Sequence, residues 1–401
     1  MRVLFACSVG GAGHLDPLRP FIESLGAGHG EILLVVPPSL EAQAATCGCR
    51  VLVGGEPRAE NLGQIRDAIA TGPRAAAAVL SERELFGRLC TAAMLDTMQA
   101  AFASLRPDLV LREPCEYASA VLAARTGTLQ AQVAISQSAI EASALKTAAE
   151  VLEGYESGVV HKIAFSPYLT RFPERLDPAA FTDTRRFSIA AGPVGAAAKW
   201  WAADERPLVY MTFGSVTGQM PIAPAVYATA LKASGSIPAR VLLTVGNSLE
   251  IAGLGALPDN VVVEAFVPQA DVFAKASLVV SHGGSGTTFG ALAAGLPQVI
   301  VPLFADHFTN AKRVVEAGAG LSVEPLAGPL GVRAGLGPDD APRIAKAVRT
   351  VLGEPAYARA AGAIAEEMAS LPSVADVLAG LRAEFDGAVG NGPVQSLFAS
   401  D

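Results

Sequence analysis

One segment of the sequence, residues 281–288, has the residue types and spacing to bind an anion. It reads Ser-His-Gly-Gly-Ser-Gly-Thr-Thr, follows an apolar run and precedes a helix-like run at residues 289–294. The first turn of a helix has about four unpaired N–H groups and a partial positive charge, and glycine lets a ligand approach that backbone closely. His282 and three hydroxyls add donors. The segment therefore predicts a diphosphate site that uses neither a Walker-type lysine nor a metal ion.

A histidine in a second glycine-rich loop has the chemistry of a general base. His14 follows Gly13 in the loop after the first apolar run. Imidazole has an unperturbed pKa of about 6.5, so it is neutral and basic at physiological pH. Glu113 ends another apolar run, and a carboxylate on the far ring nitrogen would fix the tautomer and stabilise the imidazolium. We expect His14 to take a proton from a hydroxyl and Glu113 to support it, with Glu116 as the reserve choice.

Both motifs follow apolar runs that lack alternation, which is typical of parallel strands buried on both faces. The expected strands of the first half are residues 3–9, 32–36 and 108–112, and the expected helices are residues 17–27, 61–103 and 118–125. The expected strands of the second half are residues 208–213, 240–245, 261–265, 278–281 and 298–301. Strands that alternate with helices in both halves predict an α/β chain of two Rossmann-like domains, whose parallel sheets face a deep cleft.

Proline and glycine interrupt the pattern within residues 172–201, so we place the domain linker there. The expected domains are residues 1–185 and 186–375, followed by a C-terminal helix and a partly frayed tail at residues 376–401. Trp200 and Trp201 are expected to pack at the domain junction.

Composition excludes several classes of function. The chain has 401 residues and a formal net charge of −8, so it lacks the basic field that nucleic-acid binding needs. No apolar run approaches the roughly 20 residues of a membrane span. The five cysteines are irregularly spaced, and no second pair joins Cys47 and Cys49 at zinc spacing. We expect a cytoplasmic protein with no metal site.

The order of the motifs resembles that of one known family. The matching segments are Gly13-His14-Leu15-Asp16-Pro17, Thr212-Phe213-Gly214-Ser215, Phe266-Val267-Pro268-Gln269, residues 282–288, Gly295-Leu296-Pro297 and residues 302–307, with Asn310 just beyond. Each is weak alone, but together the chain resembles the GT-B fold glycosyltransferases that decorate natural products, among them antibiotic and macrolide glycosyltransferases. The resemblance runs from residue 2 to about residue 320.

The resemblance implies a metal-independent, inverting hexosyltransferase that needs no cofactor beyond a nucleotide-sugar co-substrate. His14 would be the general base, and in relatives an acidic residue stands at the position of Glu113. The N-terminal domain would bind the acceptor, and the C-terminal domain would bind the nucleotide-sugar. Val267 would contact the base and Gln269 the ribose, and Asp306 and His307 would lie at the sugar. The residues around the diphosphate would be Gly214, Ser215, His282, Gly284, Ser285, Gly286 and Thr287.

Two residues depart from the family pattern. Many relatives have glutamine after the acidic residue at the sugar end, where this chain has His307. Users of UDP-sugars often carry glutamate near the start of the motif helix, where this chain has Gly290. That carboxylate satisfies a ribose 2′-hydroxyl, which a deoxyribose lacks. We therefore expect a dTDP-activated sugar, with a UDP-sugar as the alternative.

Other interpretations of the sequence are weaker. A nicotinamide enzyme would need a third glycine where Asp16 stands, and an acid after the second strand, where Pro37 stands. A nucleotide-sugar epimerase of the same fold would have no use for the His14 loop. A binding protein with a dead site would have no reason to keep the motif residues.

The acceptor cannot be identified from any motif. Residues 61–89 and 139–170 are Ala-rich and are expected to shape an apolar cavity, so a hydrophobic aglycone is the family-level expectation. The donor sugar, a homodimer and an activator protein are left open.

Overall fold

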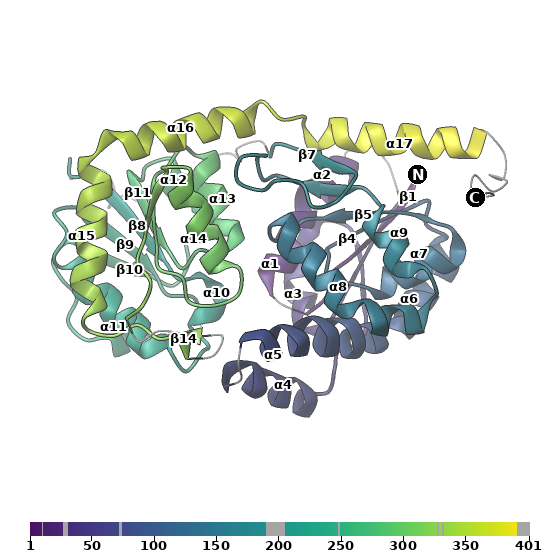
Figure 1. Cartoon of the computed structure of the whole chain (residues 1–401), viewed down its shortest axis with the longest axis horizontal. Coiled ribbons are helices and arrows are strands. Elements are labelled where there is room, and N and C mark those ends of the chain that lie inside the picture. The colour runs from purple at the N-terminus through teal and green to yellow at the C-terminus, as the bar shows by residue number, and fades with distance from the viewer. Residues whose placement is uncertain are drawn as a thin grey trace.

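The apolar runs form two parallel sheets, one in each half of the chain, in the computed structural model (Figure 1). The structure describes residues 1–9, 11–26, 31–71, 74–189, 205–247, 249–326, 329–330 and 333–390. Within these residues the expected α/β class with two Rossmann-like units is confirmed. Trp200, Trp201 and the tail at residues 391–401 lie outside the described residues.

The N-terminal sheet has seven strands, and every neighbouring pair is parallel. In sheet order they are β3 (Arg50–Val53), β2 (Glu31–Val36), β1 (Arg2–Ala6), β4 (Leu109–Arg112), β5 (Leu129–Val133), β6 (Tyr168–Thr170) and β7 (Thr184–Arg186). β1 lacks alternation because both of its faces are covered: Leu4 packs in one hydrophobic cluster and Phe5 in another. Burying each such side chain contributes about 1.5–3 kcal/mol.

The C-terminal sheet has six parallel strands. In sheet order they are β10 (Val261–Glu264), β9 (Arg240–Thr244), β8 (Leu208–Thr212), β11 (Leu278–Ser281), β12 (Gln298–Ile300) and β13 (Gly320–Ser322). A short antiparallel ribbon joins β14 (Pro329–Leu330) to β15 (Arg333–Ala334). β1 and β8 each lie where the strand order reverses, the place at which α/β sheets bind ligands.

Helices connect and cover the strands of both sheets. In the N-terminal half they are α1 (Ala12–Leu15), α2 (Arg19–Gly26), α3 (Glu41–Ala44), α4 (Ala59–Thr71), α5 (Arg74–Ala78), the π-helix η4 (Val79–Cys90), α6 (Thr91–Leu105), α7 (Ala118–Thr126), α8 (Ser138–Tyr155) and α9 (Val159–Ala164). In the C-terminal half they are α10 (Gly214–Thr217), α11 (Ala223–Ser234), α12 (Gln269–Phe273), α13 (Ser285–Ala293), α14 (His307–Glu316), α15 (Asp340–Gly353), α16 (Pro355–Ala369) and α17 (Val374–Gly390). No helix of the described residues is long and apolar enough to cross a membrane.

The chain crosses between the two halves more than once. α16 runs beside the C-terminal unit, and α17 continues over the N-terminal one (Figure 1). Val377 and Leu381 of α17 pack in the same cluster as Phe21 of α2. In the opposite direction, Phe172 and Leu176 pack against α13 and its neighbours. The segment expected as the linker therefore contains a strand, β7, and residues that pack in the core of the second unit.

Candidate active site

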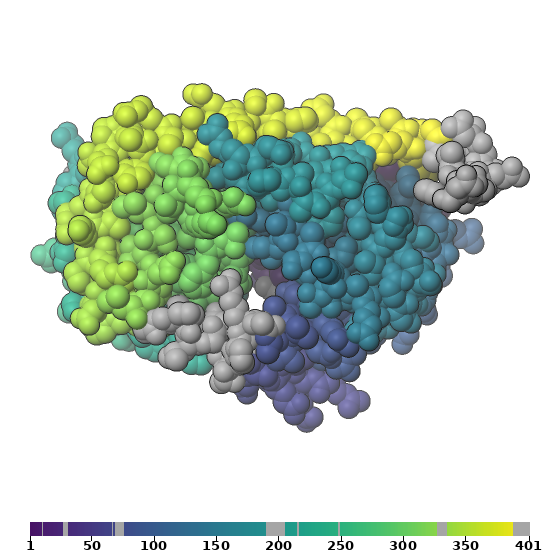
Figure 2. All heavy atoms as spheres, in the orientation of Figure 1, coloured from purple at the N-terminus to yellow at the C-terminus, as the bar shows by residue number. Residues whose placement is uncertain are grey.

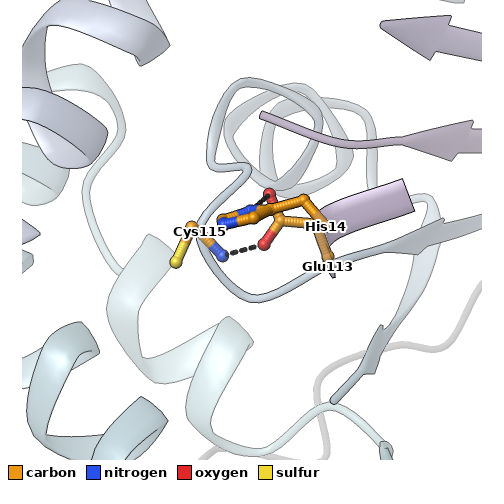
Figure 3. A group of neighbouring side chains, drawn as sticks. All are labelled: His14, Glu113 and Cys115. Carbon is orange, nitrogen blue, oxygen red and sulfur yellow. Dashed lines mark hydrogen bonds and ion pairs between the residues drawn. The ribbon is translucent and has the colours of Figure 1, made fainter. Parts of the chain in front are cut away.

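His14 and Glu113 lie together at the carboxyl edge of the N-terminal sheet (Figure 3). β1 and β4 are parallel neighbours, with Ala6 beside Arg112, so the loops that follow both strands meet at one edge. His14 lies in α1 within the first of these loops, and Glu113 directly follows β4. His14 Nδ1 is 3.1 Å from Glu113 Oε1. The ring N–H is not well aligned with that oxygen, so a small rotation of His14 would be needed for a full hydrogen bond.

The Glu113 carboxylate is held in place by the backbone. Its side chain is fully buried, its Oε1 accepts the Ser8 N–H at 2.8 Å, and its Oε2 accepts the Cys115 N–H at 2.6 Å. Glu116, the reserve choice, accepts the N–H of Ser119 instead and so caps α7. Glu113 is therefore the carboxylate that the fold places against His14.

Carboxylates around His14 make its ring more basic. Burial is the largest single effect and lowers the His14 pKa. The charge and hydrogen bonding of Glu113, added to the charges of Glu82 and Asp306, together outweigh burial, so the His14 pKa is raised. Asp306 belongs to the C-terminal unit, so its field reaches His14 from across the domain boundary. A histidine with a raised pKa can hold a proton while a reaction proceeds.

The sequence did not single out the π-helix η4 as part of this site. Phe86 of η4 stacks on the His14 ring, with centroids 5.7 Å apart and planes 27° apart. Glu82 lies four residues earlier, and its Oε2 is buried with no hydrogen-bond partner among the described residues. Burial raises the pKa of Glu82 to about 7. π-Helical turns often occur at functional sites, and the composition of residues 61–89 gave no sign of this one.

Metal-ligating atoms also come close together here. One atom each of His14, Glu113 and Cys115 lies within 4.8 Å of the other two (Figure 3). A metal would compete with the two backbone N–H groups for Glu113, and burial raises the pKa of the Cys115 thiol well above its usual value. The donor set therefore fits a metal poorly.

On the C-terminal side, glycines pack around His282 at the start of α13. A Cβ on Gly284 would lie 2.5 Å from His282 Nε2, and one on Gly214 would lie 2.7 Å from it. Gly283 has a φ of 91°, and a Cβ there would meet Ile300 at 2.8 Å. Only glycine lets β8, β11 and α13 approach this closely. His282 is thus held between the strand end after β8 and the start of α13.

Two buried imidazoles meet behind this loop. The rings of His282 and His307 are perpendicular, with centroids 4.5 Å apart. Burial lowers the pKa of each ring to about 3, so both are neutral at physiological pH. His307 Nδ1 accepts the Phe304 N–H at 3.2 Å, and only 4% of the residue is exposed. In this geometry His307 supports the loop in front of it.

Asp306 is at the centre of a hydrogen-bond network. Its Oδ2 accepts bonds from Ser285 Oγ at 2.6 Å, from Asn310 Nδ2 at 3.0 Å and from Ser136 Oγ at 3.2 Å. Ser136 belongs to the N-terminal unit, so this network joins the two units. Ala305 precedes Asp306 with a φ of 51°, a left-handed conformation that costs a non-glycine residue about 1 kcal/mol.

Asn310 is a buried hub of the same network. Its Nδ2 also donates to the Gly283 carbonyl at 2.8 Å, and its Oδ1 accepts Gln137 Nε2 at 2.7 Å. The sequence marked Asn310 only as the end of a motif and did not select Ser136 or Gln137. Nothing in the local pattern of residues 135–137 distinguishes them from an ordinary loop.

The remaining site residues predicted from the sequence lie around the same helix start. Gln269 Nε2 donates to Thr287 Oγ1 at 3.0 Å, and Val267 packs against the nearby cluster that contains Phe273. Phe266, which the sequence placed in this loop without a role, is 70% exposed. Ser215 lies in α10, and its side chain is outside the described part of the structure. Gly286 has open space on its Cβ side.

The two groups of residues face each other across the domain boundary. Figure 2 shows that the two units touch along one side and that a hollow opens between them below. A separate apolar groove lies on the N-terminal unit between α8 and α9, lined by residues such as Leu145 and Phe165. None of the predicted site residues lines that groove.

Comparisons with known proteins agree with this architecture. Residues 228–383 match the family model of the C-terminal domain of erythromycin biosynthesis protein CIII-like proteins. The chain is 32% identical over 317 residues to the L-demethylnoviosyl transferase of Streptomyces niveus, a match that covers 76% of this chain and 79% of that protein. The chain belongs to the GT-B fold family of natural-product glycosyltransferases, and the resemblance seen in the motifs is confirmed.

Solved structures share the fold. The spinosyn rhamnosyltransferase SpnG superposes with a TM-score of 0.77 at 22% identity, covering 96% of this chain and 100% of that one. SpnG has also been solved with spinosyn aglycone and with thymidine diphosphate. The glycosyltransferase SnogD from Streptomyces nogalater has a TM-score of 0.72 at 25% identity, covering 96% of this chain and 99% of that one.

Proposed function

We propose that this glycosyltransferase moves a sugar, a deoxysugar in the main case, from a dTDP-sugar to a hydroxyl of a hydrophobic natural-product aglycone, with inversion at the anomeric carbon. One observation carries the proposal. The His14–Glu113 pair on one unit, with Glu113 buried and His14 partly exposed, faces Asp306 and the start of α13 on the other, so a base and an anion site border one cleft.

The base is His14, and its two ring nitrogens have separate tasks. Nδ1 faces Glu113, which leaves Nε2 to accept the proton of the acceptor hydroxyl. As the hydroxyl oxygen bonds to the anomeric carbon, Nε2 takes its proton and Glu113 stabilises the imidazolium. Phe86 limits the tilt of the ring by stacking on it.

The leaving group is the nucleoside diphosphate. The bond between the anomeric carbon and the phosphate oxygen breaks on the side opposite the acceptor, and its electron pair stays on the diphosphate. One displacement in line inverts the anomeric configuration. The N–H groups at the start of α13 and the hydroxyl of Thr287, which accepts from Gln269 and keeps its own proton to donate, hold the negative charge that develops. Asp306 lies beside Ser285, where it would accept hydroxyls of the sugar.

Two observations support thymidine as the nucleoside. A Cβ on Gly290 would lie 3.0 Å from Phe273, so the position that carries glutamate in many users of UDP-sugars is crowded here. The structural relative SpnG has been solved with thymidine diphosphate. The exposed ring of Phe266 lies next to Val267 and is available to stack on the base. Transfer from a UDP-sugar is the alternative within the same fold.

An apolar cluster behind Phe86 supports a hydrophobic acceptor. Val9, Leu62, Leu85 and Cys90 form a small hydrophobic cluster around the π-helix that carries Phe86. The relative SpnG has been solved with the spinosyn aglycone. A polycyclic or macrocyclic alcohol would bury its apolar face against this cluster and present one hydroxyl to His14.

Incubation with a panel of dTDP- and UDP-sugars and hydrophobic aglycones, with and without EDTA, tests the proposal. Mass spectrometry should find a glycoside whose anomeric configuration, measured by NMR, is opposite to that of the donor. His14→Ala should lower transfer by about 10³-fold and leave dTDP affinity nearly unchanged. Near-normal turnover of His14→Ala would remove His14 from the mechanism. Tighter binding of UDP than of dTDP would refute the donor assignment, and conversion of the donor without an acceptor would indicate an epimerase.

A further inference from the structure

Arg171 connects the N-terminal unit to the start of α13. It directly follows β6, and its Nη2 donates to the Ser285 carbonyl at 3.3 Å and to the Gly286 carbonyl at 3.2 Å. The next residue, Phe172, stacks on Phe289 of the same helix, with centroids 3.7 Å apart. Arg171 and Phe172 therefore dock together on the first turns of α13.

The charge of Arg171 is on the unfavourable end of this helix. A helix start carries a partial positive charge and favours anions, so a cation beside it is destabilising on its own. Among the described residues Arg171 has no carboxylate within ion-pair distance; both of its hydrogen-bond partners are carbonyls. Burial lowers the pKa of Arg171 to about 10, opposed by the more distant charge of Asp16.

Two neighbouring arginines, by contrast, pair with carboxylates. Arg175 also reaches across the domain boundary, but it pairs with Glu367 of α16 at 2.6 Å. Arg186 pairs with Glu174 at 2.6 Å. Asp306, the carboxylate closest to the helix start, is engaged by hydroxyl and amide donors and does not pair with Arg171. The Arg171 guanidinium therefore lies at the start of α13 with backbone carbonyls as its hydrogen-bond partners and no carboxylate paired with it among the described residues.

We propose that Arg171 is a positioning residue for the donor diphosphate, fixing the first turn of α13 and supplying positive charge that the bound diphosphate neutralises. The proposal rests on the proposed function, because it assigns the diphosphate to the start of α13. Since Arg171 belongs to the N-terminal unit, donor binding then strengthens the contact between the two units.

Calorimetric titration of dTDP and of thymidine into the full chain separates charge from shape. Arg171→Met removes the charge, Arg171→Lys keeps it on a shorter side chain without the planar guanidinium, and Arg175→Met is the matched control at the same boundary. Arg171→Met should bind dTDP roughly tenfold more weakly and bind thymidine unchanged, with Arg171→Lys in between. Arg175→Met should match the wild type for both ligands.

The dependence of dTDP affinity on salt is a second measurement that a purely structural role would not move. The affinity of the wild type should fall more steeply with salt than that of Arg171→Met, because one charge contact is lost. Equal weakening of dTDP and thymidine, or unchanged dTDP affinity in Arg171→Met, would overturn the proposal. If the wild type binds UDP more tightly than dTDP, the same titrations with UDP and uridine test the proposal. A wild type that binds neither nucleotide overturns the proposed function itself and this inference with it.

Discussion

Replacing Glu113 by glutamine should separate the electrostatic role of this carboxylate from its shape. Glutamine has the same size but no charge, so the imidazolium that forms on His14 loses its partner 3.1 Å away. Two unit charges about 4 Å apart interact with about 4 kcal/mol at an effective dielectric constant of about 20, which corresponds to a rate loss of up to roughly 10³-fold. The amide NH2 would also face the Ser8 or the Cys115 N–H, which costs about 1–3 kcal/mol of stability.

Glu113→Gln should also shift the pH profile of kcat/KM. The reaction needs neutral His14, so kcat/KM rises as pH rises through the His14 pKa, which Glu113 raises. Glu113→Gln removes that charge, so the acid limb should move to lower pH while the plateau falls. The other groups that act on His14, Glu82 and Asp306, are unchanged in this variant.

Glu116→Gln is the matched control, because Glu116 is equally buried but binds Ser119. It should lose stability and keep both the plateau and the limb of the profile. The assay is initial-rate transfer from pH 5 to pH 9, with thermal melts of each variant. An unchanged plateau in Glu113→Gln, or an acid limb that moves to higher pH, would refute the reasoning. A rate loss in Glu116→Gln alone would make Glu116 the partner.

Two further predictions test the environment of the site. Glu82→Gln should raise the free energy of unfolding at pH 8 by about 3 kcal/mol and by far less near pH 4.5, measured by denaturant titration. The folded pKa of Glu82, about 7, exceeds the unfolded value of about 4.5, so ionisation of this carboxyl costs stability as pH rises through this window. Equal changes in the free energy of unfolding at both pH values would contradict this. The same variant should move the acid limb of the kcat/KM profile, which reports the His14 pKa, to lower pH. Gly284→Ala should weaken dTDP binding at least roughly tenfold, because its Cβ would lie 2.5 Å from His282 Nε2, whereas Gly253→Ala, where a Cβ meets nothing within 4 Å, should bind dTDP normally. Normal dTDP affinity in Gly284→Ala would show that the loop around His282 relaxes without cost.

The strands that the sequence predicted are those with a local signal. β1, β2 and β8 are continuous apolar runs because helices cover both faces of their sheets. β5 and β7 were not expected, since Leu129–Val133 alternates with glutamine and Thr184–Arg186 has two arginines. Their strand state depends on partners in the sheet, which no local pattern encodes.

The sequence by itself determined which residues lie at the two loop ends. The glycines before His14 and around His282 are local requirements for tight turns and close approach, and they are visible as motifs. Glu113 could be paired with His14 because parallel strands end at one edge of a sheet. These features needed only the order of residues and the rules of α/β topology.

Only the tertiary structure decided which residues complete the site from a distance. Arg171, Ser136 and Glu82 lie in segments without a motif, and each reaches its partners through the docking of one unit on the other or through the course of a π-helix. Likewise, the apolar positions of α17 show that one face is buried, but not that it is buried against the N-terminal unit. Contacts between residues far apart in the chain depend on packing that forms only when the whole chain folds, so no short stretch of sequence specifies them.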